Sequence, residues 1–299
     1  MMTDSAKAFS LKTAYQQLGF EYSYNSHHHW RNLPSKSRFR GKRSMPNEKH
    51  ISKSFDQDLD EAIRLFLNMG DSAAEQVAKA IHALTDTDLK LAQEVIEKDF
   101  EINRMEVELD EHILLLVAKR QPAASDLRLV MAISKGVVDL ERIGDEAVKI
   151  AKMAIKAIEQ GQATYGYAEV QHLSNQVRLM VHNALEAFNH SNAEQAFEVM
   201  RNDKVVNDEY QSAIRALMTY IMEDSRQVSK VINIIWVLRA LERIGDHAQN
   251  VAELVINSIS GQDVRHSDYA DVEKAVQEAN DRLAARQAIT DTVEDKDAR

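Results

Sequence analysis

Two pairs of acidic residues occur in identical surroundings at two places in the chain. The hexapeptide Leu-Glu-Arg-Ile-Gly-Asp occupies positions 140–145 and again positions 241–246. In a helix, residues four apart share a face, so the Glu and Asp of each copy lie side by side and repel each other. Hard carboxylate oxygens suit Mg, Mn, Fe or Zn, which would offset that repulsion. Four carboxylates are therefore candidate metal ligands: Glu141, Asp145, Glu242 and Asp246.

The second copy carries further oxygen donors along the same helix. Asn250 and Glu253 follow Asp246 at helical spacing, whereas the first copy continues with Lys149 and Lys152. Lysines one and two turns away can neutralise a carboxylate pair. We therefore expect the second set, formed by Glu242, Asp246, Asn250 and Glu253, to bind metal more tightly than the first.

A simpler interpretation of the acidic pairs needs no metal. Arg142 and Arg243, inside the hexapeptides, can act as counter-ions of an acidic stripe that faces solvent. Two more carboxylates, Asp99 and Asp203, lie in matching contexts, Asp-x-x-Ile-Asn and Asp-x-x-Val-Asn, 104 residues apart. They can add ligands, or they can cap a helix or pair with arginine, and we favour the structural role.

Long helices must position these carboxylates. The chain has three prolines and nine glycines, and beyond residue 50 it is rich in strong helix formers. Ser125 is the expected N-cap of the third helix, and Gly161 and Gly261 are the expected stops of the third and sixth. Six amphipathic helices are expected, near 55–84, 88–120, 125–160, 166–190, 192–223 and 226–260.

The repeated motifs predict that one three-helix unit is used twice. We expect an all-α fold with two tandem, pseudo-symmetric three-helix bundles, at 51–161 and 162–261. Gly144 and Gly245, inside the repeated helix, indicate that another backbone or a bulky group comes close there. The expected core includes Leu140, Ile143, Leu241, Ile244, Tyr220, Met222 and Trp236.

The two ends of the chain differ from the repeats. Residues 1–50 hold nine Lys/Arg and three Asp/Glu without apolar periodicity, which predicts a disordered basic extension. Met45 inside it is a candidate for the natural start of translation. Residues 262–299 read as a polar tail with a candidate seventh helix over Val272 to Ala284.

Composition excludes several function classes. Outside the basic extension the chain has 28 Lys/Arg and 44 Asp/Glu, and this excess of acidic residues argues against direct nucleic-acid binding. The chain has no cysteine, so disulfides and thiol chemistry are absent. Its apolar runs are too short to cross a bilayer and no signal peptide is recognised, so a cytoplasmic location is expected.

These motifs resemble a known family. The segment Pro-Ala-Ala-Ser-Asp-Leu-Arg at 122–128, followed by the two hexapeptides, is similar to the PhoU family of phosphate-specific transport regulators. The resemblance covers about residues 50–260. It implies two three-helix bundles, a homodimer, and a cytoplasmic protein without enzymatic activity. It also implies iron or zinc clusters on the Glu-x-x-x-Asp motifs, which here are Glu141/Asp145 and Glu242/Asp246.

The resemblance further implies negative regulation of the phosphate-starvation (Pho) regulon. The implied partners are the ATPase subunit of the phosphate ABC transporter and the phosphate-sensing histidine kinase, with membrane association through them. An alternative is a carboxylate di-metal oxidase or metal-storage protein on a helical bundle. Such oxidases use Glu-x-x-His, whereas His247 comes five residues after Glu242 and Glu146 takes its place in the first copy, so the ligand set is incomplete.

Overall fold

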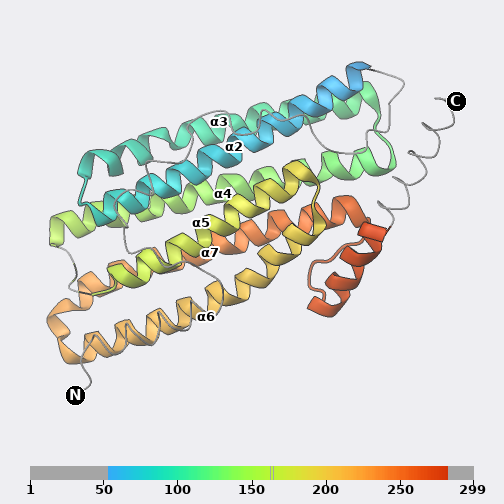
Figure 1. The fold of residues 1–299 in the computed structure, drawn as a ribbon. Coiled ribbons are helices and arrows are strands. Elements are labelled where there is room, and N and C mark those ends of the chain that lie inside the picture. Colours follow the sequence, from blue (N-terminus) through green and yellow to red (C-terminus); the bar gives the residue numbers. More distant parts are fainter. Residues whose placement is uncertain (1–52, 162, 164, 282–299) are drawn as a thin grey trace, which may run out of the picture. The chain divides into compact units, whose positions relative to one another are not determined.

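The protein is helical in both repeats. A computed structural model describes residues 53–161, 163 and 165–281, so the extension expected for residues 1–50 lies outside the described residues. None of the described helices is long and apolar enough to cross a bilayer. The helices follow the expected order (Figure 1): α2 (Lys53–Thr85), α3 (Leu89–Arg120), α4 (Ala124–Gln160), α5 (Tyr167–His190), α6 (Ala193–Glu223), the 3₁₀ turn η2 (Ser225–Gln227) and α7 (Val228–Ser260).

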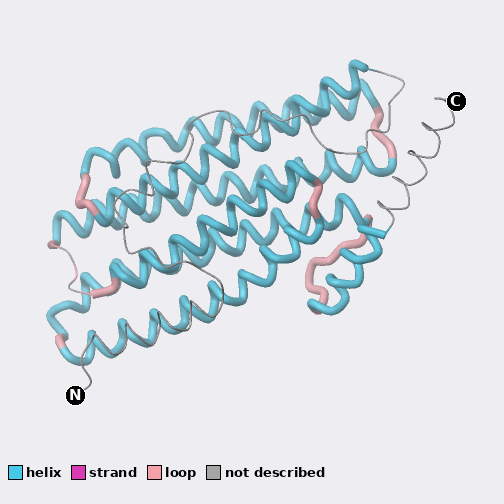
Figure 2. Tube along the Cα trace, in the orientation of Figure 1, coloured by secondary structure: helices cyan, strands magenta, loops and turns pink. Residues whose placement is uncertain are grey.

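Most helix ends lie where the sequence places them. The Asp88 side chain caps α3 by accepting a hydrogen bond from the Leu91 amide at 3.0 Å. Gly161 and Gly261, with φ of 80° and 76°, end α4 and α7 in conformations that favour glycine. Figure 2 shows that the helices are joined by short loops, which make consecutive helices antiparallel.

The expected cap of α4 is wrong. The helix begins at Ala124, the preceding residue is Ala123, and no side chain caps it. Ser125 lies inside the first turn, two residues beyond Ala123, the position where a hydroxyl can satisfy the free amides. The Pro122 turn therefore starts the helix slightly earlier than the serine indicates.

The two three-helix sets are packed into one compact unit. Helices α2, α3 and α4 contact one another, as do α5, α6 and α7, and α4 lies against α7 at the junction (Figure 1). The Phe66 and Phe188 rings, from α2 and α5, lie 4.5 Å apart across that junction. Gly70 on α2 leaves room for the Leu185 side chain, because any Cβ at Gly70 would collide with it.

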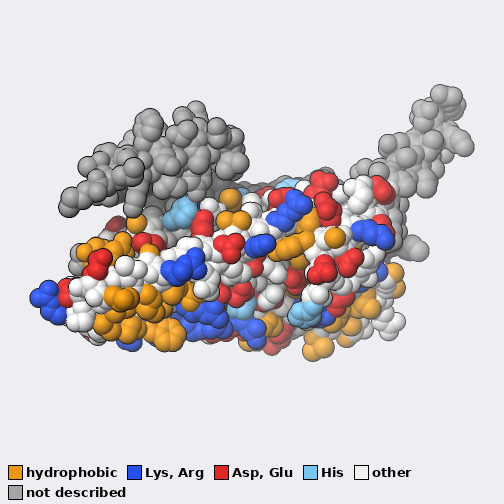
Figure 3. Space-filling view, turned by 90° about the horizontal axis from the view of Figure 1, so that it is seen from below, with side chains coloured by type: hydrophobic (Ala, Val, Ile, Leu, Met, Phe, Trp, Pro, Cys, Tyr) orange, Lys and Arg blue, Asp and Glu red, His pale blue; other side chains and the backbone are white. Residues whose placement is uncertain are grey.

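The core prediction is confirmed for the repeated motif and wrong near the joined ends of α6 and α7. Each hexapeptide buries its leucine and isoleucine, whereas Trp236 is 60% exposed and Met222 is 87% exposed. Trp236 lies on the outward side of α7, because Val237, Leu238 and Leu241 take the core face. Figure 3 shows apolar side chains on the surface where α6 joins α7.

The tail is less polar than expected. Residues 269–281 form a helix, which confirms the described part of the candidate seventh helix. The Tyr269 hydroxyl donates to the Met200 carbonyl at 3.1 Å, and its ring packs against Phe197 of α6. The buried side of this helix consists of small and branched apolar residues: Val272, Ala275, Val276 and Ala279.

Candidate functional site

Each three-helix set carries an acidic cluster where its second helix crosses the hexapeptide of its third. The carboxylates in each cluster lie close enough for neighbouring charges to raise one another's pKa. The first acidic cluster consists of Asp99 and Glu106 on α3 with Glu141 and Asp145 on α4. The second acidic cluster consists of Asp203 on α6 with Glu242, Asp246 and Glu253 on α7.

The repeated glycines allow the helices of each cluster to approach closely. A Cβ built on Gly144 would lie 2.8 Å from Cδ1 of Ile102, so a bulky group does come close there as expected. A Cβ on Gly245 would lie 3.4 Å from Cγ1 of Val206 and 3.7 Å from Oδ1 of Asp203, which is ordinary contact. The close approach of α6 thus places the Asp203 carboxyl over the second hexapeptide.

Asp203 is the most perturbed carboxyl of the second acidic cluster. It is 8% exposed, and burial followed by the charges of Asp246 and Glu242 raises its pKa to about 6. One oxygen accepts from the Asn207 amide at 2.8 Å, while the other, Oδ1, is buried without a hydrogen-bond partner among the described residues. The role favoured from the sequence, a helix cap or an arginine pair, is therefore wrong for Asp203.

The predicted ligands on α7 are partly neutralised. Burial, followed by the charge of Asp246, raises the pKa of Glu242, and burial also raises the pKa of Asp246 itself. Arg239 donates to Oε1 of Glu242, but Oε2 is buried without a partner in the described structure. Burial raises the pKa of Glu253, which accepts from Gln249 at 3.0 Å. Arg239 is therefore the arginine that hydrogen-bonds Glu242, and Arg243 acts on Glu242 and Asp246 through its charge alone.

The arginine inside the second hexapeptide makes its direct ion pair outside that hexapeptide, although its charge still lowers the pKa of Glu242 and Asp246. Arg243 reaches across to α4 and lies 3.1 Å from Glu146, a carboxylate that is 2% exposed. Lys149, expected to neutralise the first acidic pair, also binds Glu146, at 2.9 Å. Both cations thus stabilise one buried carboxylate at the junction of α4 and α7.

The first acidic cluster is more exposed than the second. Burial is the largest cause that raises the pKa of Asp99, Glu106 and Glu141. The charge of Asp145 is the second cause for Asp99 and Glu141, whereas for Glu106 the charge of Asp110 comes before that of Asp145. Lys152 opposes the shift at Asp99, so it is the lysine that faces this cluster. The structure therefore brings Asp99 to the predicted ligands Glu141 and Asp145.

Asn250, expected to extend the second ligand set, is turned toward α4 instead. Its amide donates to Oδ1 of Asp139 at 2.8 Å, and Nδ1 of His247 lies 3.0 Å from the same oxygen. Asn250 therefore donates its amide to Asp139, while His247 contacts Asp139 through Nδ1 and its charge lowers the pKa of Asp246. The buried contact that these side chains make between the two repeats is therefore separate from the acidic clusters.

The donor chemistry of the clusters fits a cation, but their present geometry does not form a closed site. In the described part of the chain, no group of three or more Asp, Glu, His or Cys side chains is arranged to hold a metal ion. The unpartnered oxygens of Asp203 and Glu242 are the hard donors that iron or zinc accepts. Side-chain rotations are therefore needed to bring the carboxylates together around an ion.

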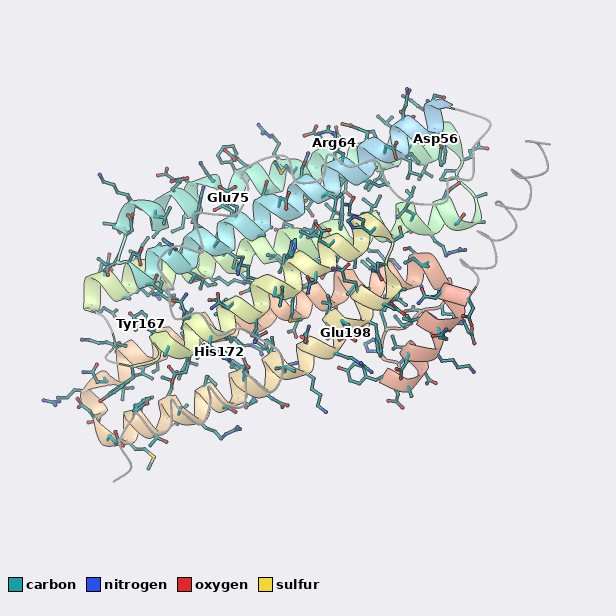
Figure 4. All side chains as sticks on the ribbon, in the orientation of Figure 1. Asp56, Arg64, Glu75, Tyr167, His172 and Glu198 are labelled. Atoms are coloured by element: carbon teal, nitrogen blue, oxygen red, sulfur yellow. The ribbon has the colours of Figure 1, made fainter. Side chains whose placement is uncertain are left out.

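A groove between α5 and α6 is a feature that the sequence did not indicate. It encloses about 460 Å³ over Leu173 and Ala213. His172, labelled on α5 in Figure 4, lies 3.0 Å from Glu209 on α6, and this hydrogen bond raises the pKa of the imidazole. Helical periodicity assigns no special role to His172, because its partner is 37 residues away.

The duplicated architecture has a counterpart among known proteins. The PhoU domain model matches residues 66–154 and again residues 170–255. The chain belongs to the PhoU family. Each matched stretch contains one acidic cluster, so both copies of the PhoU domain in this PhoU-family protein present the Glu-x-x-x-Asp pair.

Relatives and solved structures agree with that assignment. The chain is 52% identical over 217 residues to the phosphate-specific transport system accessory protein PhoU homolog of Pseudomonas aeruginosa, covering 73% of this chain and 90% of the relative. It is 41% identical over 223 residues to the accessory protein PhoU of Escherichia coli, covering 75% and 92%.

Two crystal structures show the same fold. PhoU from Pseudomonas aeruginosa has a TM-score of 0.68 and 51% identity, and covers 70% of this chain and 100% of its own. The phosphate transport system regulatory protein PhoU from Streptococcus pneumoniae has a TM-score of 0.65 and 27% identity, and covers 70% and 99%. The all-α fold with tandem three-helix bundles is therefore the PhoU fold.

Proposed function

We propose that this PhoU-family protein is a cytoplasmic, non-enzymatic adaptor that represses the phosphate-starvation regulon. It links the ATPase subunit of the phosphate ABC transporter to the phosphate-sensing histidine kinase, and it reaches the membrane through these partners. Support for a role in phosphate transport comes from relatives named as accessory proteins of the phosphate-specific transport system. The finer assignment of partners follows from the motifs that resemble that family.

The observation that carries this proposal is the pair of acidic clusters, one in each repeat. An adaptor needs two docking surfaces, and a duplicated unit provides two related ones. Burial keeps several of these carboxylates short of counter-ions, as the unpartnered oxygens of Asp203 and Glu242 show. Such surfaces suit a basic partner, or an iron or zinc ion that reverses the local charge.

The adaptor acts by binding one conformation of a partner better than another. A ligand shifts an equilibrium only by its differential affinity for the two states. Coupling between transporter and kinase then requires that occupancy of one surface changes affinity at the other. The buried contacts between α4 and α7, including Arg243 with Glu146, join the two repeats that carry these surfaces.

A pull-down compares the wild type with the Glu242→Ala/Asp246→Ala variant, using the kinase and the transporter ATPase subunit as baits. The variant is expected to lose at least one partner. The matched control is Glu194→Ala/Glu198→Ala, which removes the same charge at the same spacing from the exposed side of α6. Unchanged binding by the Glu242→Ala/Asp246→Ala variant removes the second acidic cluster from the mechanism.

Deletion of the gene in the source organism tests the direction of regulation. Loss of a repressor should produce phosphate-starvation expression even when phosphate is plentiful, and a plasmid copy should restore repression. Normal repression in the deletion strain would contradict the proposal. Metal analysis of protein purified without chelator or tag tests separately for iron or zinc.

A further inference from the structure

The groove between α5 and α6 has apolar walls and an acidic rim. Its volume of about 460 Å³ is in the range of sites that hold a small molecule. Its apolar lining consists of Leu173, Val205, Ala213 and Ala216, and its acidic lining consists of Glu169, Asp208 and Glu209. His172 is the one basic side chain among the described residues that line it. An occupant that matches this lining is apolar along its length and positively charged.

Larger side chains occupy the corresponding positions of the first repeat. Helix α6 is the counterpart of α3, with an offset of 104 residues. Where the groove has Ala213 and Ala216, α3 has Leu109 and His112. Nε2 of His112 lies 2.8 Å from the carbonyl oxygen of Asp58, so this imidazole bridges α3 and α2. The three-helix unit can thus fill this space with its own side chains, whereas the second repeat leaves it open.

A shorter helix also opens the groove. Helix α2 has 33 residues, whereas α5, its counterpart, has 24. Both helices end just before the second helix of their repeat, so α5 lacks the first turns that α2 has. Tyr165, which precedes α5, stacks instead on Tyr220 of α6, with ring centroids 4.0 Å apart. This ring pair lies about one turn beyond Ala216, at one end of the groove.

The acidic side chains lie at two positions along the groove. Nε2 of His172 on α5 lies 3.0 Å from Oε1 of Glu209 on α6, so these two residues are side by side. Asp208 adjoins Glu209 in the sequence, whereas Glu169 precedes His172 by about one helical turn, roughly 5 Å along α5. A cation with two positive charges at a comparable separation matches this spacing.

Glu209 is short of hydrogen-bond donors. Its Oε1 contacts His172, while Oε2 is buried without a partner among the described residues. None of the described residues that line the groove is a lysine or an arginine. Charges interact more strongly where water is excluded, so a cation in the groove is attracted more by this carboxylate than by a solvated one. A protonated His172 competes with such a cation.

We propose that the groove between α5 and α6 is a binding site for a short aliphatic diamine. The alkyl chain of the diamine lies against Leu173, Val205 and Ala213. Its two ammonium groups are held by Glu209 at one position and by Glu169 at the other. The groove belongs to neither acidic cluster, and the proposal does not depend on the proposed regulatory role.

Calorimetric titration of 1,4-diaminobutane into the full chain, in chelator-treated buffer, measures the binding. The wild type should bind the diamine saturably, and Glu209→Gln should weaken the binding by about tenfold. His172→Ala should strengthen it by about threefold, because the imidazole no longer holds Oε1 of Glu209. A variant that merely loses its fold does not bind more tightly, so opposite changes at two touching residues distinguish a binding site from structural damage.

Filling the groove provides a second test. Ala216→Leu places a larger apolar side chain in the groove, much as the first repeat does, and should abolish binding of the diamine. Gln211→Leu, at an exposed position of α6 outside the lining, is the matched control and should bind like the wild type. Equal binding by Ala216→Leu and Gln211→Leu would place the diamine outside the groove and overturn the proposal.

Related cations test which features of the diamine are recognised. Butylamine has the alkyl chain with a single ammonium group, and Mg²⁺ has the charge without the chain. Both should bind more weakly than the diamine, because each lacks one of the two features that the groove matches. A wild type that shows no saturable binding, or one from which equimolar Mg²⁺ displaces the diamine, overturns the proposal.

Discussion

Nδ1 of His247 on α7 lies 3.0 Å from Oδ1 of Asp139 on α4, a buried polar contact between the two repeats. The same Asp139 oxygen accepts from Asn250 at 2.8 Å, so one carboxylate of the first repeat holds two side chains of the second. His247 and Asp139 are 6% and 9% exposed. Buried polar groups of this kind are costly when either partner is removed.

Asp139→Ala should lower the free energy of unfolding by about 2–3 kcal/mol, because His247 and Asn250 lose their buried acceptor. Asp139→Asn should cost less, since the amide oxygen still accepts a hydrogen bond. Urea unfolding followed by circular dichroism measures both. Asp110→Ala on the exposed side of α3 is the control and should change little. Equal losses for Asp139→Ala and Asp110→Ala would show that the contact contributes nothing.

Stability should depend on pH through Asp203. Its pKa is raised from 3.8 to about 6 in the folded chain, so between these values the folded state binds more protons than the unfolded state. The contribution of Asp203 to stability is therefore most favourable below pH 3.8, falls as pH rises to about 6, and is constant above.

Asp203→Asn removes that dependence. The variant should be more stable than the wild type above pH 6, and the difference should vanish toward pH 3.8. Thermal unfolding in chelator-treated buffer across this range checks the result. Asp208→Asn, on the exposed side of the same helix, is the control and should follow the wild-type curve. A difference that does not change with pH would mean that Asp203 is not the titrating group.

The repeated glycines should respond differently to alanine. Alanine is favoured over glycine inside a helix by about 1 kcal/mol. Gly245→Ala should gain much of this, since its methyl meets Val206 at ordinary contact distance, 3.4 Å. Gly144→Ala should gain less or lose stability, because its methyl would lie 2.8 Å from Cδ1 of Ile102.

A double-mutant cycle separates the causes at Gly144. Ile102→Val removes the obstructing methyl, so Gly144→Ala should be better tolerated in that background than in the wild type. Chemical unfolding of the four proteins gives the coupling free energy. A cycle without coupling would show that the Ile102 side chain is not what restricts position 144.

Metal affinity should be higher at the second acidic cluster than at the first. The second has the unpartnered oxygens of Asp203 and Glu242, whereas the first faces Lys152. In zinc titrations by calorimetry, Asp246→Ala should therefore lose more binding than Asp145→Ala. Glu198→Ala, on the exposed side of α6 and in neither cluster, is the control. A greater loss from Asp145→Ala reverses the expected order.

The amino-acid sequence by itself determined the helices and their duplication. Local backbone preferences and a 3.6-residue period account for the long helices, for their stops at Gly161 and Gly261, and for the buried leucine and isoleucine of each hexapeptide. Both act within a few residues of the chain. The acidic pairs on one helix face follow from the same local geometry, as do the two matched PhoU domains.

Only the tertiary structure decided which neighbour each side chain meets. Periodicity defines an apolar face but does not say how far it is turned toward a second helix. Trp236 therefore became a surface residue, Asn250 turned to Asp139, and Arg243 reached Glu146 on another helix. Such contacts join residues about a hundred positions apart, and their geometry depends on how α4 packs against α7, which no local pattern specifies.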